Sequence, residues 1–466
     1  MTKAIAPVSA LLLSVAILLM GNGLQGTLLP VRAQIESFSA FDIGILGSAY
    51  FLGFAAGCLL GPFMVRRVGH IRAFTAMVSI ASTTVLAHVV LLDPYAWWPL
   101  RAVTGFCFAV LYMIIESWLN ERATNENRGL VFSVYTIINL TVLTIGQMMM
   151  VLGKPSDFLL FALSSILVSL AAVPVAMSKS QEPAPLITVR VRIKYLYRIS
   201  PVGAAGSFVV GLTNGSFWSL APFYAQLSGT TTTGIALFMS TAVIAGAAGQ
   251  WPLGHLSDKW DRRKVIVITS VGAAAAGLGL GLVVRSWSME TFALSMLFGA
   301  FALPLYALCA AHMNDFVEPG GFVEASSGLL LLYAGGAVVG PIIASVAMRG
   351  MGPGGLFVFT AVAHAAMAMF AIYRMTSRAA PPESARGKFA DALRMASAVS
   401  VVDTMAGSPG HEHPAGASAP ASQNGQPAGE AVTAPGPETR GGTAHGENIN
   451  EDDRQTDGDH PKPEDR

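Results

Sequence analysis

Residues 254–264 read Gly-His-Leu-Ser-Asp-Lys-Trp-Asp-Arg-Arg-Lys. This stretch is short and densely charged, and it lies between two long apolar segments. Charged side chains are costly inside hydrocarbon, so a stretch of this kind belongs outside the membrane core. An aspartate followed closely by a basic cluster at such a place predicts a loop with a specific role between two membrane helices.

Composition supports a membrane protein on both sides of this loop. The chain has 466 residues, of which 53% are hydrophobic and 12% are charged, whereas a soluble globular chain carries about 25% charged residues. Apolar runs of membrane-spanning length recur, and such spans must be helical because lipid offers backbone amides no partners. Cys58, Cys107 and Cys309 all lie in apolar runs without metal-ligand spacing, so we expect them to pack rather than to form disulfides.

Twelve membrane spans are predicted, each long enough to cross the hydrocarbon layer. The N-terminal run resembles a signal peptide, but it is longer than an ordinary signal core and more spans follow, so we interpret it as an uncleaved first helix. The expected spans are residues 8–29, 44–64, 74–92, 98–118, 130–151, 157–177, 203–224, 234–254, 265–284, 291–311, 326–347 and 354–374.

Lysine and arginine predict the orientation of these spans. The side that carries the N-terminus and the even-numbered loops holds Lys3, Arg66, Arg67, Arg72, Arg122, Arg128, Lys179, Arg190, Arg192, Lys194, Arg198, Lys259, Arg262, Arg263, Lys264, Arg374 and Arg378. The opposite side, helix ends included, holds Arg32, Arg101, Lys154, Arg285 and Arg349. We therefore expect both termini in the cytoplasm of a bacterial cell, with the spans in its inner membrane.

An internal repeat divides the chain into two halves. The segment from Asn22-Gly23 to Ala33-Gln34 matches the segment from Asn214-Gly215 to Ala225-Gln226, at an offset of 192 residues. Later the offset grows to 194, where Gly105 and Gly146 match Gly299 and Gly340. We expect an N-terminal six-helix half at 1–177, a linker at 178–200 and a C-terminal half at 201–376. Either an amphipathic helix or a short, partly ordered extension at 377–405 follows, and then a disordered tail at 406–466.

Glycines at four-residue spacing also predict close helix packing. Gly53, Gly57 and Gly61 recur in the second span, and Gly336 and Gly340 recur in the eleventh. Small residues one turn apart let helix backbones approach in lipid, where apolar burial cannot drive association.

The loop at 254–264 resembles the signature loop of the major facilitator superfamily, Gly-x-x-x-Asp-Arg/Lys-x-Gly-Arg-Arg/Lys. Gly254, Asp258, Lys259, Arg262 and Arg263 match that signature, and Asp261 replaces its second glycine. The runs Glu-Ser-Trp-Leu-Asn at 116–120 and Arg-Arg-Val-Gly-His-Ile-Arg at 66–72 are similar to the YcaD-like branch. The resemblance covers residues 5–376 and implies two rocking halves around a midplane site, without naming a substrate.

The first-half copy of the loop, residues 62–72, is degenerate. Arg66 occupies the position of Asp258, although Arg66, Arg67 and Arg72 keep the positive charge of a cytoplasmic gate. Glu116, near the cytoplasmic end of the fourth span, is the candidate acidic partner. A carboxylate there is an ion-pair partner of these arginines, a protonatable coupling group, or a solvated group at the interface. We also expected Asp258 to lie against a helix N-terminus.

Arg101 opens the fourth span in the pattern Arg-x-x-x-Gly, which resembles the family's fourth-helix arginine motif associated with proton coupling. Arg101, Gly105, Phe108, Tyr112 and Glu116 share one helical face. Two interpretations stay open, because this arginine can line a cavity or reach outward to lipid headgroups.

Polar residues inside the other spans are the candidate substrate contacts. The family resemblance implies a cavity lined by the first, fourth, seventh and tenth helices. Asn22 and Asn214 are repeat-related, and so are Tyr112 and Tyr306. The predicted substrate-binding residues are Asn22, Gln25, Tyr112, Asn139, Asn214, Trp218 and Tyr306. Hydrogen bonding between helices is the alternative role for the amides.

The sequence thus predicts an all-α polytopic membrane protein with twelve helices in two pseudo-symmetric halves. We expect a monomeric secondary transporter of a small neutral, weakly charged or amphipathic solute, coupled to protons, with efflux favoured. Patterns for ATP hydrolysis, catalysis, metal or cofactor binding and nucleic-acid recognition are lacking, so we expect no enzyme activity and no cofactor. The alternative is a sensor or assembly scaffold of the same fold that acts through its C-terminal tail.

Overall fold

Long helices make up the described part of this computed structural model, which comprises residues 8–123, 128–177, 192–283, 288–318, 321–377, Gly387 and Phe389. The first half contains α2 (Ser9–Ile35), α3 (Ala40–Val68), α4 (His70–Val90), α5 (Pro94–Arg122), α6 (Arg128–Met148) with η2 (Met149–Leu152), and α7 (Phe158–Leu170) with α8 (Ala172–Ala176). After α9 (Ile193–Ile199) come α10 (Pro201–Leu227), α11 (Thr232–Lys259), α12 (Arg262–Leu278) with η3 (Gly279–Val283), α13 (Met289–Ala302) with α14 (Leu305–Asn314), α15 (Phe322–Met351) and α16 (Gly355–Ser377).

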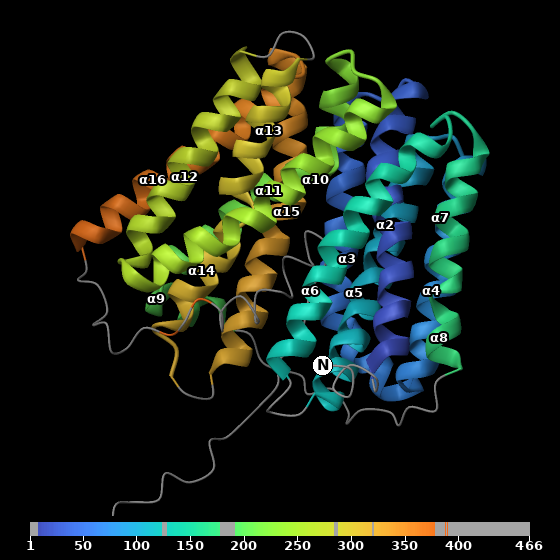
Figure 1. Cartoon of the computed structure of the whole chain (residues 1–466), viewed down its shortest axis with the longest axis horizontal. Helices are drawn as coiled ribbons and strands as arrows, with labels where there is room; N and C mark the ends of the chain where they lie inside the picture. The colour runs from blue at the N-terminus through green and yellow to red at the C-terminus, as the bar shows by residue number, and fades with distance from the viewer. Residues whose placement is uncertain are drawn as a thin grey trace, which may run out of the picture. The chain divides into compact units, whose positions relative to one another are not determined.

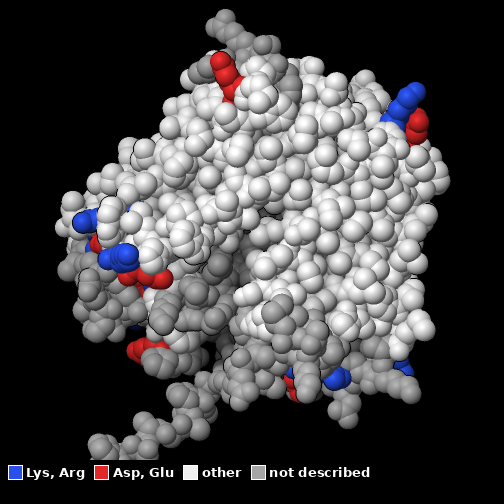
Figure 2. Space-filling model, viewed as in Figure 1, with Lys and Arg blue, Asp and Glu red and all other residues white. Residues whose placement is uncertain are grey.

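These helices confirm the twelve expected spans, each of which falls on one helical segment to within a few residues. Eleven segments are long and apolar enough to cross a membrane. The twelfth is α10, whose 27 residues include the buried polar side chains Thr213, Asn214 and Ser216, which lower its hydropathy. Figure 2 shows charged side chains gathered at the two ends of the helices, with an uncharged band between them.

Short turns connect the helices at each end. Between α3 and α4 the turn is Gly69 alone, whose φ of 87° lies in the left-handed region that glycine adopts without strain. Between α11 and α12 the turn is Trp260 and Asp261. We call the helix ends at these two turns the basic face. The ends of α2 and α10 and the start of α3 lie on the opposite face, where Ser39 and Asp42 form a capping box.

The repeat found in the sequence is reproduced as equivalent contacts in the two halves. A Cβ atom built on Gly105 would come closer than 3.0 Å to the carbonyl oxygen of Tyr50, and one built on Gly299 would approach that of Ala242 equally closely. Ala242 lies 192 residues after Tyr50, and Gly299 lies 194 residues after Gly105. The second and fourth spans of each half therefore touch through the same backbone positions.

A second pair of glycine contacts is also equivalent in the two halves. Gly146 packs against the backbone of Met20, and Gly340 packs against that of Leu212, which is again a shift of 194 and 192 residues. The four-residue glycine spacing is confirmed as well, because a Cβ on Gly53 would meet the Ala102 carbonyl within 3.0 Å. Figure 1 shows the helices of the two halves as two groups side by side, and this arrangement is the major facilitator fold that the sequence predicts.

The two halves contact one another on the face opposite the basic face. Gly44, in the first turns of α3, lies against Ser345 and the carbonyl oxygen of Pro341 in the last turns of α15. Gly47, one turn further along α3, lies against Ser219 of α10. Only a residue without a Cβ fits at these two positions of α3. The halves are thus joined where α3 begins.

Three expectations fall wholly or largely outside the described residues. They are the cytoplasmic N-terminus at residues 1–7, the segment at 377–405 apart from Ser377, Gly387 and Phe389, and the tail at 406–466. The boundaries of the halves remain predictions, and the short α9 lies inside the expected linker.

We expect Gly299→Ala to lower the Tm of the detergent-solubilised protein. Its new methyl group must displace the backbone of α11, which costs about 1–3 kcal/mol against a helix-propensity gain of about 1 kcal/mol. Gly350→Ala is the matched control, because a Cβ there meets nothing within 4 Å. A Tm for Gly299→Ala at or above that of Gly350→Ala would contradict this packing.

Candidate functional site

A cavity lies between the two halves, with an empty volume of about 650 Å³ including its open mouth. Its walls come from α2, α3, α5 and α6 of the first half and from α10 and α11 of the second. The first, fourth and seventh spans contribute as the family resemblance implied, whereas no residue of the tenth, α13 with α14, lines it among those described. The contacts of Gly44 and Gly47 close this region toward the opposite face.

Arg101 is the charged side chain of the cavity wall within the described part of the chain. Its Cζ lies 4.3 Å from the centre of the Tyr50 ring, which is within cation–π range. Its Nη1 is buried without a hydrogen-bond partner. Of the two interpretations that the sequence left open, the structure places this guanidinium in the cavity and not at the lipid surface.

Two of the predicted substrate-binding residues share this wall with Arg101. Asn22 of α2 and Trp218 of α10 line the cavity, as does Gln147 of α6. The Nε1 of Trp218 and the Oε1 of Gln147 are buried without hydrogen-bond partners. Polar groups from both halves therefore converge on one space. Tyr50 also lines it, and sequence reasoning missed it because one tyrosine in an apolar span carries no distinguishing signal.

The remaining predicted substrate contacts lie outside the cavity wall. Gln25 and Asn139 are buried, and Asn139 lies beside Tyr135. Tyr112 is fully buried beside Asn22. Asn214 is buried in α10, and Tyr306 packs edge-on against Tyr333 with ring centres 5.5 Å apart. The repeat-related asparagines thus differ, because Asn22 reaches the cavity and Asn214 does not.

Glu116 lies deep in the first half and is only 2% exposed. Tyr112, Tyr135 and Cys58 are close enough to interact with its carboxyl group electrostatically. The arginines at 66, 67 and 72 are exposed, and within the described ranges no ion pair joins any of them to Glu116. The gate ion pair that the sequence left open is not formed in this conformation.

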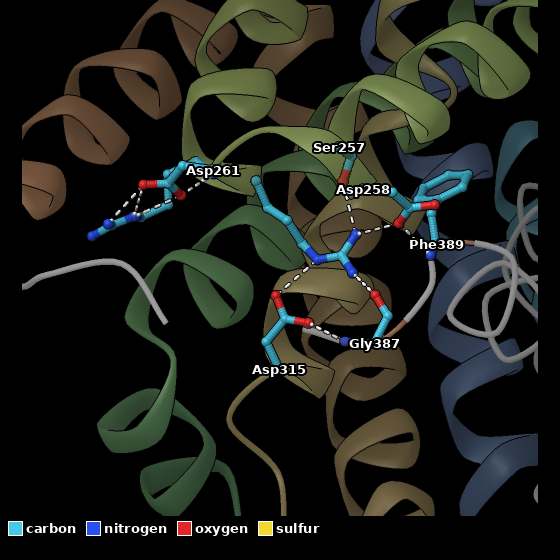
Figure 3. A network of polar contacts seen from close by, with 8 residues as sticks. Ser257, Asp258, Asp261, Asp315, Gly387 and Phe389 are labelled. Atoms are coloured by element: carbon cyan, nitrogen blue, oxygen red, sulfur yellow. Dashed lines mark hydrogen bonds and ion pairs between the residues drawn. The ribbon is translucent and has the colours of Figure 1, made fainter. Parts of the chain in front are cut away.

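The motif loop forms a network of charges at the basic face (Figure 3). Arg262 Nε donates to Asp315 Oδ2 over 2.8 Å, and both side chains are 1% exposed. Arg262 Nη1 donates to Ser257 Oγ over 2.8 Å and to Asp258 Oδ1 over 3.5 Å. These contacts tie the end of α11 and the start of α12 to the end of α14.

The segment that follows α16 completes this network. The backbone N–H of Phe389 donates to Asp258 Oδ1 over 2.6 Å, and that of Gly387 donates to Asp315 Oδ1 over 3.1 Å. Arg262 Nη2 donates to the carbonyl oxygen of Gly387. The Phe389 ring covers Gly254, where a Cβ would overlap it. This contact explains the first glycine of the motif.

One expectation about the loop was wrong. Asp258 lies in the last turn of α11, not against a helix N-terminus, because the helix continues to Lys259. The residue at a helix N-terminus is Asp261, which caps α12 and accepts the N–H of Arg263 over 3.0 Å. Partial burial raises the pKa of Asp261, but the hydrogen bonds and charge of Arg263 outweigh this and hold it below its usual 3.8.

Asp315 and Phe389 were missed by the sequence reasoning. Asp315 lies 194 residues after Glu121, so an acidic residue at the same end of both fourth spans was the signal that could have found it. In the first half the counterpart of Arg262 is His70, 192 residues earlier, and His70 packs against Trp118 with ring centres 6.0 Å apart. The first half thus has an aromatic contact where the second half has an ion pair.

The sequence matches a known protein family and several of its members. The family model of the Major Facilitator Superfamily matches residues 11–201 and 203–421. The chain belongs to this superfamily. It is 26% identical over 357 residues to "Uncharacterized MFS-type transporter YcaD" of Salmonella arizonae, covering 76% of this chain and 92% of that one. The protein of the same name from Escherichia coli is 27% identical over 363 residues, with the same coverage.

Solved structures of low sequence identity share the fold. The nucleoside transporter NupG superposes with a TM-score of 0.68 at 11% identity, over 80% of this chain and 100% of that one. An inward-facing bacterial homologue of the human lysosomal transporter Spinster gives 0.59 at 14% identity, over 84% and 97% of the two chains. Its membership of the superfamily makes this chain a multi-pass membrane transporter.

We expect Arg262→Gln to destabilise this transporter strongly. Removing one partner of the buried pair leaves the Asp315 carboxylate without its compensating charge, which costs about 3–5 kcal/mol. The measurement is the Tm in detergent. Arg192→Gln is the control, because it breaks an ion pair to Glu324 in which the arginine is 64% exposed, and screening by water leaves little to lose. Equal Tm losses in the two variants would contradict a stabilising role for the buried Arg262–Asp315 ion pair.

Proposed function

We propose that this transporter carries a small amphipathic solute, neutral or weakly charged, across the bacterial inner membrane by alternating access. The observation that carries this proposal is the cavity between the halves, at which Asn22, Arg101, Gln147 and Trp218 converge from both sides. Its walls also contain Ile43, Leu46, Phe51, Leu143 and Met239, which suit an apolar body. A site shared by two rocking halves is what alternating access requires.

The contacts between the halves support the state of the cycle in which the cavity is closed toward the outside. Gly44 and Gly47 join α3 to the second half on the face opposite the basic face. The lysine and arginine bias supports a cytoplasmic basic face with both termini inside. On that orientation the cavity is closed toward the outside in this conformation. Efflux rather than uptake rests on the resemblance to the superfamily alone.

We propose the basic-face gate at residues 66, 67, 72, 254, 258, 259, 262 and 263. In this conformation Asp258 and Arg262 are held within the second half by Asp315, Gly387 and Phe389. Arg66, Arg67 and Arg72 of the first half are exposed. These arginines are free to meet another surface when the basic face closes, and a monomer contains both sides of this gate.

Proton coupling is proposed for Glu116. A buried carboxylate in a low-dielectric core is costly to ionise, so its proton is bound or released according to the state of its surroundings. Glu116 shares one face of α5 with Arg101 and Tyr112, which links the cavity to the basic-face end of the same helix.

We expect Glu116→Gln to abolish the pH dependence of transport while the protein still folds, because the amide keeps the shape and loses the proton. The measurement is uptake into proteoliposomes, in buffers from acidic to alkaline, of a compound first found by ligand-induced thermal shift. Glu121→Gln is the control, since Glu121 is an exposed carboxylate further along the same helix. A pH profile for Glu116→Gln like that of the native protein would exclude the coupling role.

A scaffold that acts through its tail makes a different prediction. If this protein is a transporter, truncation after residue 405 should leave the uptake rate per folded molecule unchanged, because the cavity is built from α2 to α11. The measurement is the same uptake assay beside the full chain. Loss of uptake from a truncated protein with native Tm would favour the scaffold.

A further inference from the structure

Arg101 differs from Arg32, another described arginine of the membrane helices near the opposite face. Arg32 forms an ion pair with Glu36, Nε to Oε1 over 2.7 Å, within a single helix turn. Arg101 has no such partner in the described part of the chain, and no described residue of the cavity wall is an aspartate or glutamate. The ionisable side chains that interact with it electrostatically are Tyr50 and His88, and neither supplies a carboxylate.

A guanidinium in this position is incompletely compensated. The Tyr50 ring offsets part of its desolvation by a cation–π contact, which is worth about 0.5–2 kcal/mol. The buried Nη1 still lacks an acceptor, and an unmade bond to a charged group is among the most costly in a protein interior. A planar guanidinium presents two parallel N–H donors, and the ligand that matches them is a carboxylate.

The rest of the cavity determines what the carboxylate is attached to. Gln147 and Trp218 add neutral polar groups beside Arg101, whereas Leu46, Phe51 and Met239 form an apolar wall. A second negative charge would find no further cation on this wall. An apolar body would bury its surface there and gain about 25 cal/mol for each square ångström. Doubly charged and fully neutral solutes are therefore less well matched than a monoanion.

We propose that the cavity binds an amphipathic organic monoanion, whose carboxylate pairs with Arg101 and whose apolar body lies against the α3 and α11 wall. This inference rests on the proposed transport function and names its substrate class. It narrows the solute from neutral, weakly charged or amphipathic to a monocarboxylate. The bound carboxylate also neutralises Arg101, so the occupied cavity carries no net charge. A neutral site is less costly than a lone arginine in the low-dielectric membrane interior while the halves move.

The test uses three matched pairs of probes with the purified full chain in detergent. Phenylbutyrate, naphthylacetate and octanoate are each compared with the corresponding primary amide, which has the same apolar body and no charge. Dissociation constants come from titrations followed by thermal shift. We expect at least one carboxylate to bind at least tenfold more tightly than its amide. Inorganic phosphate should not displace it, because phosphate has no apolar body.

Three variants assign that preference to a residue. Arg101→Gln should bind the carboxylate and its amide equally, and Arg101→Lys should keep part of the preference, since a lysine offers a point charge without the paired donors. Arg349→Gln removes an exposed arginine near the end of α15 and should keep the full preference. Binding of the amides by Arg101→Gln reports that this variant is folded.

Several outcomes overturn the proposal. One is the absence of binding by all six probes, and another is equal binding of every carboxylate and its amide by the native chain. Survival of the preference in Arg101→Gln, or displacement by phosphate at similar concentration, would also do so. Transport of an amide by proteoliposomes, together with equal binding of the pairs, would leave the proposed transporter standing and remove only the monoanion.

Discussion

Backbone contact between helices at glycine is the constraint on which the rest of this structure depends. Lipid tails are as apolar as the helices, so the hydrophobic effect cannot bring spans together, and close backbone packing must do so. Gly105 and Gly299 meet the second spans of their halves at equivalent carbonyl groups, and Gly44 and Gly47 join one half to the other. The same chemical device therefore builds each half and closes the cavity between them. Halves that are each held together by such backbone contacts are suited to rocking as units.

The symmetric scaffold carries an asymmetric set of polar residues. Arg101 corresponds to Ser295 by the later offset of 194, and Ser295 is tied into the helix packing by a hydrogen bond to the carbonyl oxygen of Phe238 over 3.0 Å. Glu116 corresponds to Ala310, and Tyr50 to Ala242. Gly105 and Gly146 follow the repeat because packing requires it in both halves, whereas Arg101, Glu116 and Tyr50 depart from it. Departures from the repeat are thus the best guide to function in this chain.

Much of the fold could be predicted from the sequence, because its causes are local or periodic. Hydropathy placed every span on a helix, and the offset of the repeat placed the glycine contacts. The candidate site could be predicted from the sequence only in part. Sequence showed that Arg101 and Asn22 are polar residues in apolar spans, but whether a side chain faces lipid or a cavity depends on helix rotation and on the neighbouring helix. Tyr50 became visible only through the guanidinium above it, and Phe389 only through its contact with Gly254, 135 residues earlier.

The charge network of the second half contains a buried ion pair, Arg262 with Asp315, and a partly exposed carboxylate, Asp258, and these two parts differ in what they can contact. Asp315 and Arg262 are buried together and belong to the same half, so this pair holds the start of α12 to the end of α14 without crossing between the halves. Asp258 is 35% exposed and is shared between Arg262 and the backbone of Phe389, so it is the member that a partner from the first half could reach. Because the first half has Arg66 at the repeat position of Asp258, an arginine of the first half is the group that would pair with this carboxylate if the basic face closes.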